Sequence, residues 1–176
     1  NSPAITVALI PTQSIITFNP VTANTAASVA YQFTTTVIGL AVNDKVVLVL
    51  PSLTGQTTAL TVAETDCGTT TWAGALTNSG QATATVTYTA ATAALAAAQT
   101  CTITTATGLS TPNVVQAQNF GTRTVALTLV NSADLAAQLI PNSPAITVAL
   151  IPTQSIITFA AVTANTAASV GYQFTT

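Results

Sequence analysis

The chain carries very little charge and lacks residue types on which many protein activities depend. Its 176 residues include two Lys+Arg, four Asp+Glu and no His, so 3% are charged, against about 25% in typical globular proteins. The net charge is -2 and no basic cluster exists, which argues against nucleic acid as a partner, because binding phosphates requires clustered Lys and Arg. Without His, neither a Ser-His-Asp nor a Cys-His catalytic arrangement can form.

Long apolar runs and methionine are also missing. The mean hydropathy is +0.59, yet no run of 18 apolar residues occurs, so we predict no membrane span. The sequence contains no Met, and we expect that no secretory signal peptide remains in it. We therefore expect it to be cleaved from a precursor or to be an excerpt of a longer protein. No N-x-[ST] sequon is present, although the abundant Thr residues could carry O-glycans.

Threonine and alanine dominate what is present, with 38 Thr and 33 Ala. Short segments of alternating apolar and polar residues predict half-buried β-strands, and β-branched Thr suits their outer faces. Turn residues separate these segments, which together favour an all-β sandwich. Ala90–Gln99 is predicted to form one short helical segment, and Ser132–Leu139 another short turn. The predicted strands are Ala4–Ile10, Ser28–Thr36, Lys45–Leu50, Thr57–Val62, Gly68–Trp72, Ala82–Thr89, Thr100–Thr105 and Thr122–Val130.

The two cysteines, Cys67 and Cys101, lie outside any C-x-x-C motif, and no His is available to complete a zinc site. A reactive thiol is one interpretation, but no basic residue lies nearby in the sequence to activate it. A disulfide is the favoured interpretation. It would close a loop of about 35 residues, worth about 3–4 kcal/mol, and would place the protein in an oxidising, extracellular setting.

An internal repeat is the strongest feature of the sequence. Residues 1–35 and 142–176 are identical at 32 of 35 positions, differing at Asn19/Ala160, Pro20/Ala161 and Ala30/Gly171. The period of 141 residues is the size of one sandwich domain and predicts a repeat architecture.

Two prolines set the predicted module boundaries, because Pro11 and Pro152 both follow the sequence AITVALI. Residues 1–11 would close a preceding module, residues 12–152 would form a complete module, and residues 153–176 would open the next. The inter-module strand would then bury one apolar face in the same kind of groove in both copies. That face comprises Ile5, Val7 and Leu9 in the first copy, and Ile146, Val148 and Leu150 in the second.

Two stretches resemble a known family. TANTAASVAYQFTTTVIGLAVNDKVVLVLP (22–51) and AAAQTCTITTATGLSTPN (96–113) resemble immunoglobulin-like tandem modules of very large secreted surface proteins, with Asn43-Asp44 in place of the usual Gly-Asp. The resemblance covers about a third of the chain. It implies an immunoglobulin-like β-sandwich with a stalk or filament role, and it transfers no catalytic residue. In such domains a Trp often packs against the disulfide, so Trp72 is expected to do so; an exposed Trp that stacks on carbohydrate is the alternative. The alternation within Ser28–Thr36 predicts Tyr31 and Phe33 as core aromatics.

Few residues remain that could carry chemistry. Glu64 and Asp66 share a face if they lie in a strand, so half of a calcium site and solvated loop charges are both open interpretations, the latter favoured. Asp44-Lys45 is expected to be a surface turn. Arg123 is expected to be a solvated strand-end residue or half of a salt bridge, with a recognition role as the alternative.

We conclude from the sequence that this is not an enzyme and needs no cofactor. The favoured function is a structural building block of an extracellular filament or cell-surface appendage, with copies of itself as partners. These copies would join as tandem repeats in one chain or as separate subunits that lend a terminal strand. The alternative function is an adhesin or glycan-binding domain on a repeat stalk.

Overall fold

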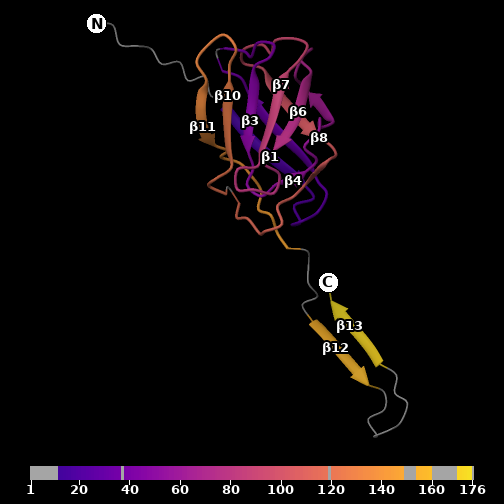
Figure 1. Cartoon of the computed structure of the whole chain (residues 1–176). Coiled ribbons are helices and arrows are strands. Elements are labelled where there is room, and N and C mark those ends of the chain that lie inside the picture. The colour runs from indigo at the N-terminus through magenta and orange to yellow at the C-terminus, as the bar shows by residue number, and fades with distance from the viewer. Residues whose placement is uncertain (1–11, 37, 119, 149–153, 160–169, 176) are drawn as a thin grey trace.

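The computed structural model describes residues 12–36, 38–118, 120–148, 154–159 and 170–175, which form antiparallel β-sheets and contain no helix (Figure 1). A four-stranded sheet has the order β1-β2-β8-β5, formed by β1 (Thr12–Asn19), β2 (Ser28–Thr34), β8 (Thr100–Thr105) and β5 (Val62–Thr65). A five-stranded sheet has the order β11-β10-β3-β7-β6, formed by β11 (Leu135–Leu139), β10 (Thr124–Thr128), β3 (Lys45–Val49), β7 (Thr85–Ala90) and β6 (Trp72–Thr77). Two short strands, β4 (Thr54–Gly55) and β9 (Leu109–Ser110), pair with each other.

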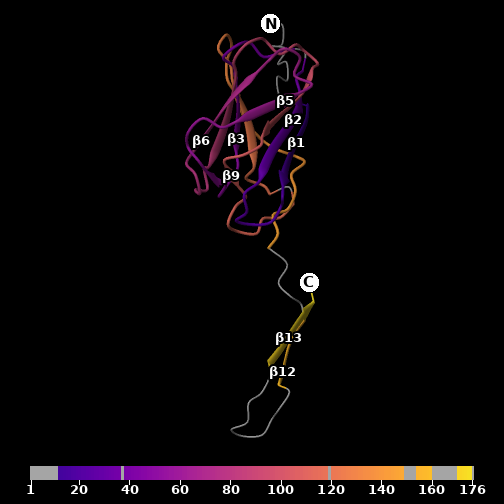
Figure 2. The same cartoon turned by 90° about the vertical axis from the view of Figure 1, so that its right-hand side faces the viewer.

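The two large sheets pack face to face as a β-sandwich (Figures 1 and 2). Burial alternates with period two along most strands, as in β6, where every second residue is buried. In β8, Cys101 and Ile103 are fully buried, while Thr102 between them is half-buried. Threonine therefore fills the outer positions of this strand, as the alternation in the sequence predicts.

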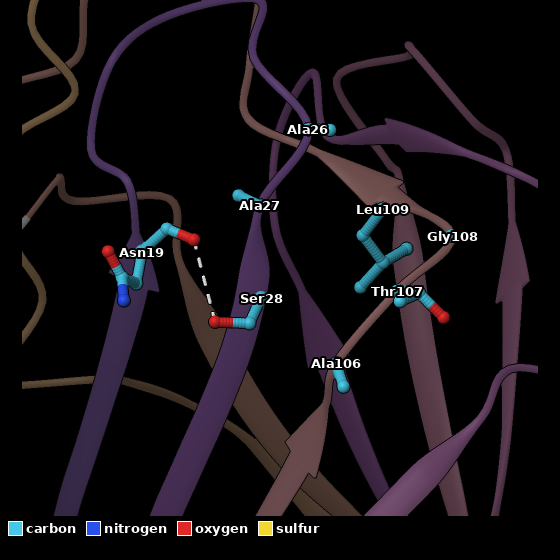
Figure 3. A pocket seen from close by; sticks show the side chains of 8 residues that line it. All are labelled: Asn19, Ala26, Ala27, Ser28, Ala106, Thr107, Gly108 and Leu109. Carbon is cyan, nitrogen blue, oxygen red and sulfur yellow. Dashed lines mark hydrogen bonds between the residues drawn. The ribbon is translucent and has the colours of Figure 1, made fainter.

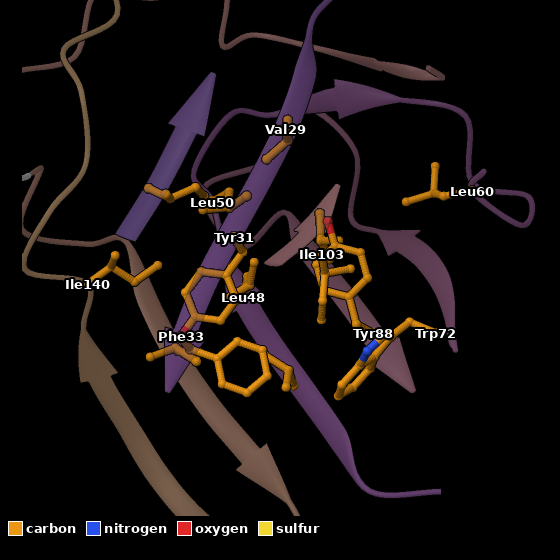
Figure 4. Packing of buried hydrophobic residues seen from close by; sticks show 14 of the residues in the cluster. Val29, Tyr31, Phe33, Leu48, Leu50, Leu60, Trp72, Tyr88, Ile103 and Ile140 are labelled. Carbon is orange, nitrogen blue, oxygen red and sulfur yellow. The ribbon is translucent and has the colours of Figure 1, made fainter. Parts of the chain in front are cut away.

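Aromatic rings from both sheets fill the centre of the sandwich (Figure 4). The Tyr31 and Phe33 rings stack with centroids 5.4 Å apart. Each buried tyrosine in the described core has a hydroxyl partner at 2.9 Å: Tyr31 pairs with Ser14, and Tyr88 with Thr105. The rings therefore contribute apolar contact without leaving their phenol groups unsatisfied.

The chain enters the sandwich at one end and leaves it at the other (Figure 1). Thr12 begins β1 beside Thr34, at what we call the entrance end. The last described residues of the sandwich, Thr147 and Val148, lie beyond the far end of β1, where Thr147 pairs with Thr22. We call this the exit end. The two ends of a domain often lie close together. Here they lie at opposite ends of the sandwich, which favours the linear connection of successive domains.

A second hairpin follows the sandwich. Strands β12 (Gln154–Phe159) and β13 (Val170–Thr175) pair antiparallel and belong to no larger sheet among the described residues. In both views the hairpin lies beyond the exit end of the sandwich (Figures 1 and 2).

The prediction of a helical segment at Ala90–Gln99 is wrong. After β7 ends at Ala90, the described chain makes bends and a turn as far as Gln99. Leu95 pairs with Leu40 through hydrogen bonds of 2.8 and 2.9 Å, and its side chain is buried. Pairing with a distant segment thus overrides the helix propensity of alanine, which is weak in so short a segment.

Three other local predictions differ from the structure. In the predicted strand Thr57–Val62 the chain makes bends and an isolated bridge at Leu60, and β5 begins only at Val62. Ser132–Leu139, expected as a turn, contains the edge strand β11, which is largely exposed. The predicted strand Gly68–Trp72 is instead a turn closed by a Thr70-to-Cys67 hydrogen bond, and β6 begins only at Trp72. No helix in the described residues is both long and apolar enough to cross a membrane.

Candidate functional site

The disulfide between Cys67 and Cys101 is present and both cysteines are buried. It ties the turn between β5 and β6 to the first part of β8, the strand that pairs with β5 in the four-stranded sheet. Phe33 is the cross-strand partner of Cys101, and its ring meets that of Trp72 edge-on at 6.1 Å. Trp72, Tyr31 and Phe33 are all buried in the same core cluster as the disulfide. A direct contact between Trp72 and the disulfide stays a prediction.

The most distinctive feature of the sandwich is the way in which its last segment is held. We call residues 142–148 the closing segment. It crosses from β11 to the free edge of β1, where Asn142 accepts a hydrogen bond from the Ile16 amide at 2.9 Å. Further along, Thr147 bonds with Val21 and Ala23 at 3.0 and 2.7 Å. Both contacts on this edge are parallel bridges, so the segment runs in the same direction as β1.

Ile146 anchors the closing segment. Its side chain is fully buried in the core cluster, and its backbone exchanges two hydrogen bonds with Gln116, of 2.8 and 3.1 Å. Val148, two residues on, is 58% exposed in this chain. It therefore does not share the buried face expected for it, because the pairing of the segment with the sandwich ends at Thr147. The other residues predicted to share that face, Ile5, Val7, Leu9 and Leu150, lie outside the described residues.

A buried arginine supports the same segment. Arg123 is 1% exposed, which corrects the expectation of a solvated strand end. Its guanidinium donates to the Gln116 side-chain oxygen at 2.7 and 3.3 Å, and to the Pro144 carbonyl at 2.6 Å. The Gln116 amide group donates in turn to the Pro51 carbonyl at 2.8 Å. Gln116 and Arg123 thus join the closing segment to the loop that follows β3.

The charge of Arg123 is held by neutral groups. Its hydrogen-bond acceptors are amide and carbonyl oxygens, and the rings of Phe18 and Phe120 lie 5.1 and 5.9 Å from the guanidinium carbon. Burial lowers the pKa of Arg123 to about 10, so the group stays cationic at neutral pH. A buried cation held by neutral acceptors and aromatic faces is a structural anchor, and removing an acceptor would leave it poorly solvated.

The burial of Arg123 could have been predicted from the sequence. Arg123 is in phase with Val125 and Leu127, both of which are buried on the inner face of β10. Alternation therefore placed the sole arginine on the core side. Gln116 had no such signal, because its partners come from residues 51, 123 and 146, which are brought together only by the fold.

Two of the surface hollows formed by the described residues lie beside β1. The larger, of about 330 Å³, lies near the exit end beside the loop after β1 (Figure 3). Its lining offers amide, hydroxyl and methyl groups but no charged or aromatic side chain: Asn19, Ala26, Ala27, Ser28, Ala106, Thr107, Gly108 and Leu109. The other, of about 250 Å³, lies between β1 and the closing segment, where Asn142 and Pro144 form part of its wall.

The acidic residues do not converge on a site. Glu64 and Asp66 are exposed, and the described residues contain no group of three His, Cys, Asp or Glu side chains placed to hold a metal. Asp44 is buried, contrary to the surface turn expected for it. Its carboxylate accepts hydrogen bonds of 2.7 Å from the Ala41 and Val130 amides and so fastens two loops at the entrance end.

These contacts hold the closing segment against the sandwich of the same chain. Backbone groups along β1 and at Gln116 take up an extended segment, a core position takes its isoleucine, and Arg123 holds its proline carbonyl. No family model, curated protein or solved structure matches this chain.

Proposed function

We propose that this chain is a structural building block of an extracellular filament or surface appendage, in which immunoglobulin-like sandwich modules follow one another head to tail. The observation that carries the proposal is the position of the chain ends of the sandwich. Residues enter at one end and leave at the opposite end, and the sequence of the first hairpin then begins again. Serial connection of such modules produces a line.

The connection between successive modules is short. Val148 is the last described residue of the sandwich, and Gln154 begins the next hairpin. Six residue steps span at most about 20 Å. The exit end of one sandwich would therefore meet the entrance end of the next directly.

Exposed apolar side chains at the two ends support this contact. Val42 and Val130 are exposed at the entrance end, where Asp44 holds their loops together. Val114, Val115 and Val148 are exposed at the exit end, around the pairing of Gln116 with Ile146. In an array these valines would cover one another, which would remove apolar surface from water. The buried disulfide is compatible with an oxidising, extracellular setting.

The test is a lengthened chain in which residues 36–176 are repeated after Thr176, which supplies a second complete module. Small-angle X-ray scattering should show a stiff rod longer than the original by one sandwich. A matched chain with Val115→Asp and Val42→Asp should keep both sandwiches folded but lose the fixed angle between them. Two sandwiches that move independently in the unmutated chain, or that pack side by side, would contradict the proposal. Tight binding of a glycan by monomeric chain would favour the adhesin instead.

A further inference from the structure

We infer that the groove that holds the closing segment is also a binding site for the N-terminal segment of a second copy of this chain. We call this groove the slot; it comprises the free edge of β1, the Val21–Ala23 backbone, Gln116 and Arg123. The ligand is the extended peptide NSPAITV, residues 1–7, which is identical in sequence to the closing segment, residues 142–148. The inference does not depend on the tandem array, because it concerns separate chains.

The slot recognises groups that both segments possess. Gln116 and the edge of β1 pair with backbone amides and carbonyls, Arg123 binds the carbonyl of a proline, and the core accepts one isoleucine. Residues Pro3 and Ile5 occupy the positions of Pro144 and Ile146 in the repeat. Identical sequences offer identical groups, so a slot that accepts one segment accepts the other.

The N-terminal segment cannot fill the slot of its own chain. In the slot, the segment runs parallel to β1 and ends near Val21, at the exit end. Val7 would lie there, whereas Thr12 begins β1 at the entrance end, roughly 25 Å away at about 3.3 Å per strand residue. The five steps from Val7 to Thr12 reach at most about 18 Å. Parallel neighbours in a sheet also need a connection of about a dozen residues or more, and only residues 8–11 lie between.

Any slot that this segment fills therefore belongs to another sandwich, and in a second copy of this chain it competes there with the closing segment already in place. Attachment in the same chain gives the closing segment the advantage of a high effective concentration. Exchange takes place when the closing segment is weakened or leaves the slot. A chain bound in this way continues from its residues 8–11 into its own β1, as residues 149–152 continue toward β12. The joint between two molecules would then copy the joint between two modules.

A cysteine cross-link tests this inference. Thr22 is the parallel partner of Thr147, and Thr6 is the repeat equivalent of Thr147. Neighbouring positions on paired strands lie within the Cα separation that a disulfide spans. We propose the full chain with Thr6→Cys and Thr22→Cys, combined with Ile146→Asp to weaken the closing segment. Mild oxidation should give a ladder of dimers and longer species on a non-reducing gel.

The matched control carries Thr22→Cys and Thr147→Cys with Ile146 intact, and should cross-link within one molecule and remain monomeric. If circular dichroism shows that Ile146→Asp unfolds the sandwich, the experiment is repeated with Ile146→Ala. This change still weakens the closing segment but places no charge in the core. A monomeric cross-link between Thr6→Cys and Thr22→Cys would overturn the inference by showing that the slot is filled in the same chain. Absence of any such cross-link in folded protein would overturn it as well.

A peptide measurement separates slot recognition from nonspecific association. The synthetic peptide NSPAITVALIP, fluorescently labelled at its C-terminus, is titrated with the full-length Ile146→Asp or Ile146→Ala chain. It should bind about 100-fold more tightly than the same peptide with aspartate in place of its isoleucine at position 5, because that side chain would enter the core. Equal binding of the two peptides would refute the slot, while leaving the end-to-end array untouched.

Discussion

The same hairpin sequence occurs twice in this molecule, in two different surroundings. Strands β1 and β2 pair inside the sandwich, where β2 also pairs with β8. Strands β12 and β13 repeat this sequence with one change, Ala30 to Gly171, and pair with each other alone among the described residues. An isolated two-stranded hairpin is marginally stable in water, so the two copies differ mainly in what surrounds them.

The central register is the same in both copies, but the start of the first strand is not. Ile16 pairs with Tyr31, and Ile157 with Tyr172, 141 residues later in each case. The register of β1 shifts between Thr12 and Ile15, whereas that of β12 is regular from Gln154 to Phe159. Two contacts within the sandwich lie at this shift in register. The Ser14 hydroxyl hydrogen-bonds with the Tyr31 hydroxyl, and Ile15 forms a β-bridge with Asn142. Local sequence thus encodes the pairing, and tertiary contacts set the bulge.

The largest expected effect comes from the tyrosine that the two hairpins share. Tyr31 is fully buried, so Tyr31→Ala should lower the free energy of unfolding by about 3–5 kcal/mol, the cost of deleting a core aromatic ring. Tyr172→Ala removes the equivalent residue from β13, and we expect the sandwich to change by less than about 0.5 kcal/mol. Urea denaturation followed by Trp72 fluorescence measures both. Equal losses would mean that the second hairpin packs on the sandwich.

Removing the disulfide should destabilise the sandwich almost as much and leave the second hairpin unaffected. Cys67 and Cys101 are 34 residues apart in sequence, and both lie in the sandwich. The double change to serine should cost about 3–4 kcal/mol, because the unfolded chain regains the entropy of an open loop. Amide chemical shifts in β12 and β13 should be unchanged at temperatures where the sandwich remains folded. A loss below about 1 kcal/mol would show that the cross-link adds little to the fold.

Alkaline pH should destabilise the sandwich through its buried tyrosines. Burial raises the pKa of Tyr31 and raises that of Tyr88 to about 12. Above pH 10 the unfolded chain therefore loses phenol protons that the folded chain keeps, and stability falls. Arg123 acts in the opposite direction, because its folded pKa of about 10 lies below its ordinary value, so stability is gained above pH 10. The two phenols lower the free energy of unfolding with rising pH, and the one guanidinium raises it. The net effect is a decrease in the free energy of unfolding of about 1.4 kcal/mol per pH unit between pH 10 and 12.

The repeat supplies the control for this pH experiment. Tyr31→Phe removes one of the two opposing phenols, so the net slope above pH 10 should fall to about zero. Tyr172→Phe makes the same change in β13 and should leave the slope unaltered. Urea midpoints at pH 8, 10 and 11 give the slopes. A slope that persists in Tyr31→Phe would assign the alkaline loss to other groups.

Much of the sandwich could be predicted from alternation and turn residues. The span of β8 agrees with prediction, and β2 and β3 begin at the predicted residues. The failures occurred where distant partners decide the local structure. Leu95 belongs to an alanine-rich segment that favours a helix in isolation, and only its pairing with Leu40 explains the observed turn. The exposed edge strand β11 is held by β10 and lacks a buried face of its own.

The candidate site was predictable only in part. Two cysteines in a chain without histidine made the disulfide a direct inference, and the repeat drew attention to the segment that contains Ile146. The residues that hold this segment could not be found in the same way. Gln116 lies in an irregular loop, and its role depends on Pro51, Arg123 and Ile146 meeting at the exit end. Sequence periodicity reports the face on which a residue lies, but not its partner across the fold.

The smallest expected effect concerns Ala30 and Gly171, the one difference between the two hairpins at positions that are paired in both copies. Glycine within a strand costs about 0.5–1 kcal/mol relative to alanine, because it loses more backbone entropy on ordering. Gly171→Ala should therefore strengthen β12–β13 pairing, seen as slower amide hydrogen exchange in residues 154–159, with no change in the sandwich. Ala30→Gly should lower sandwich stability by a similar amount, because Ala30 pairs on both sides, with Thr17 and Thr104. If Gly171→Ala leaves exchange unchanged, then β12–β13 pairing is limited by the missing neighbours rather than by this residue, and only a complete second module would stabilise it.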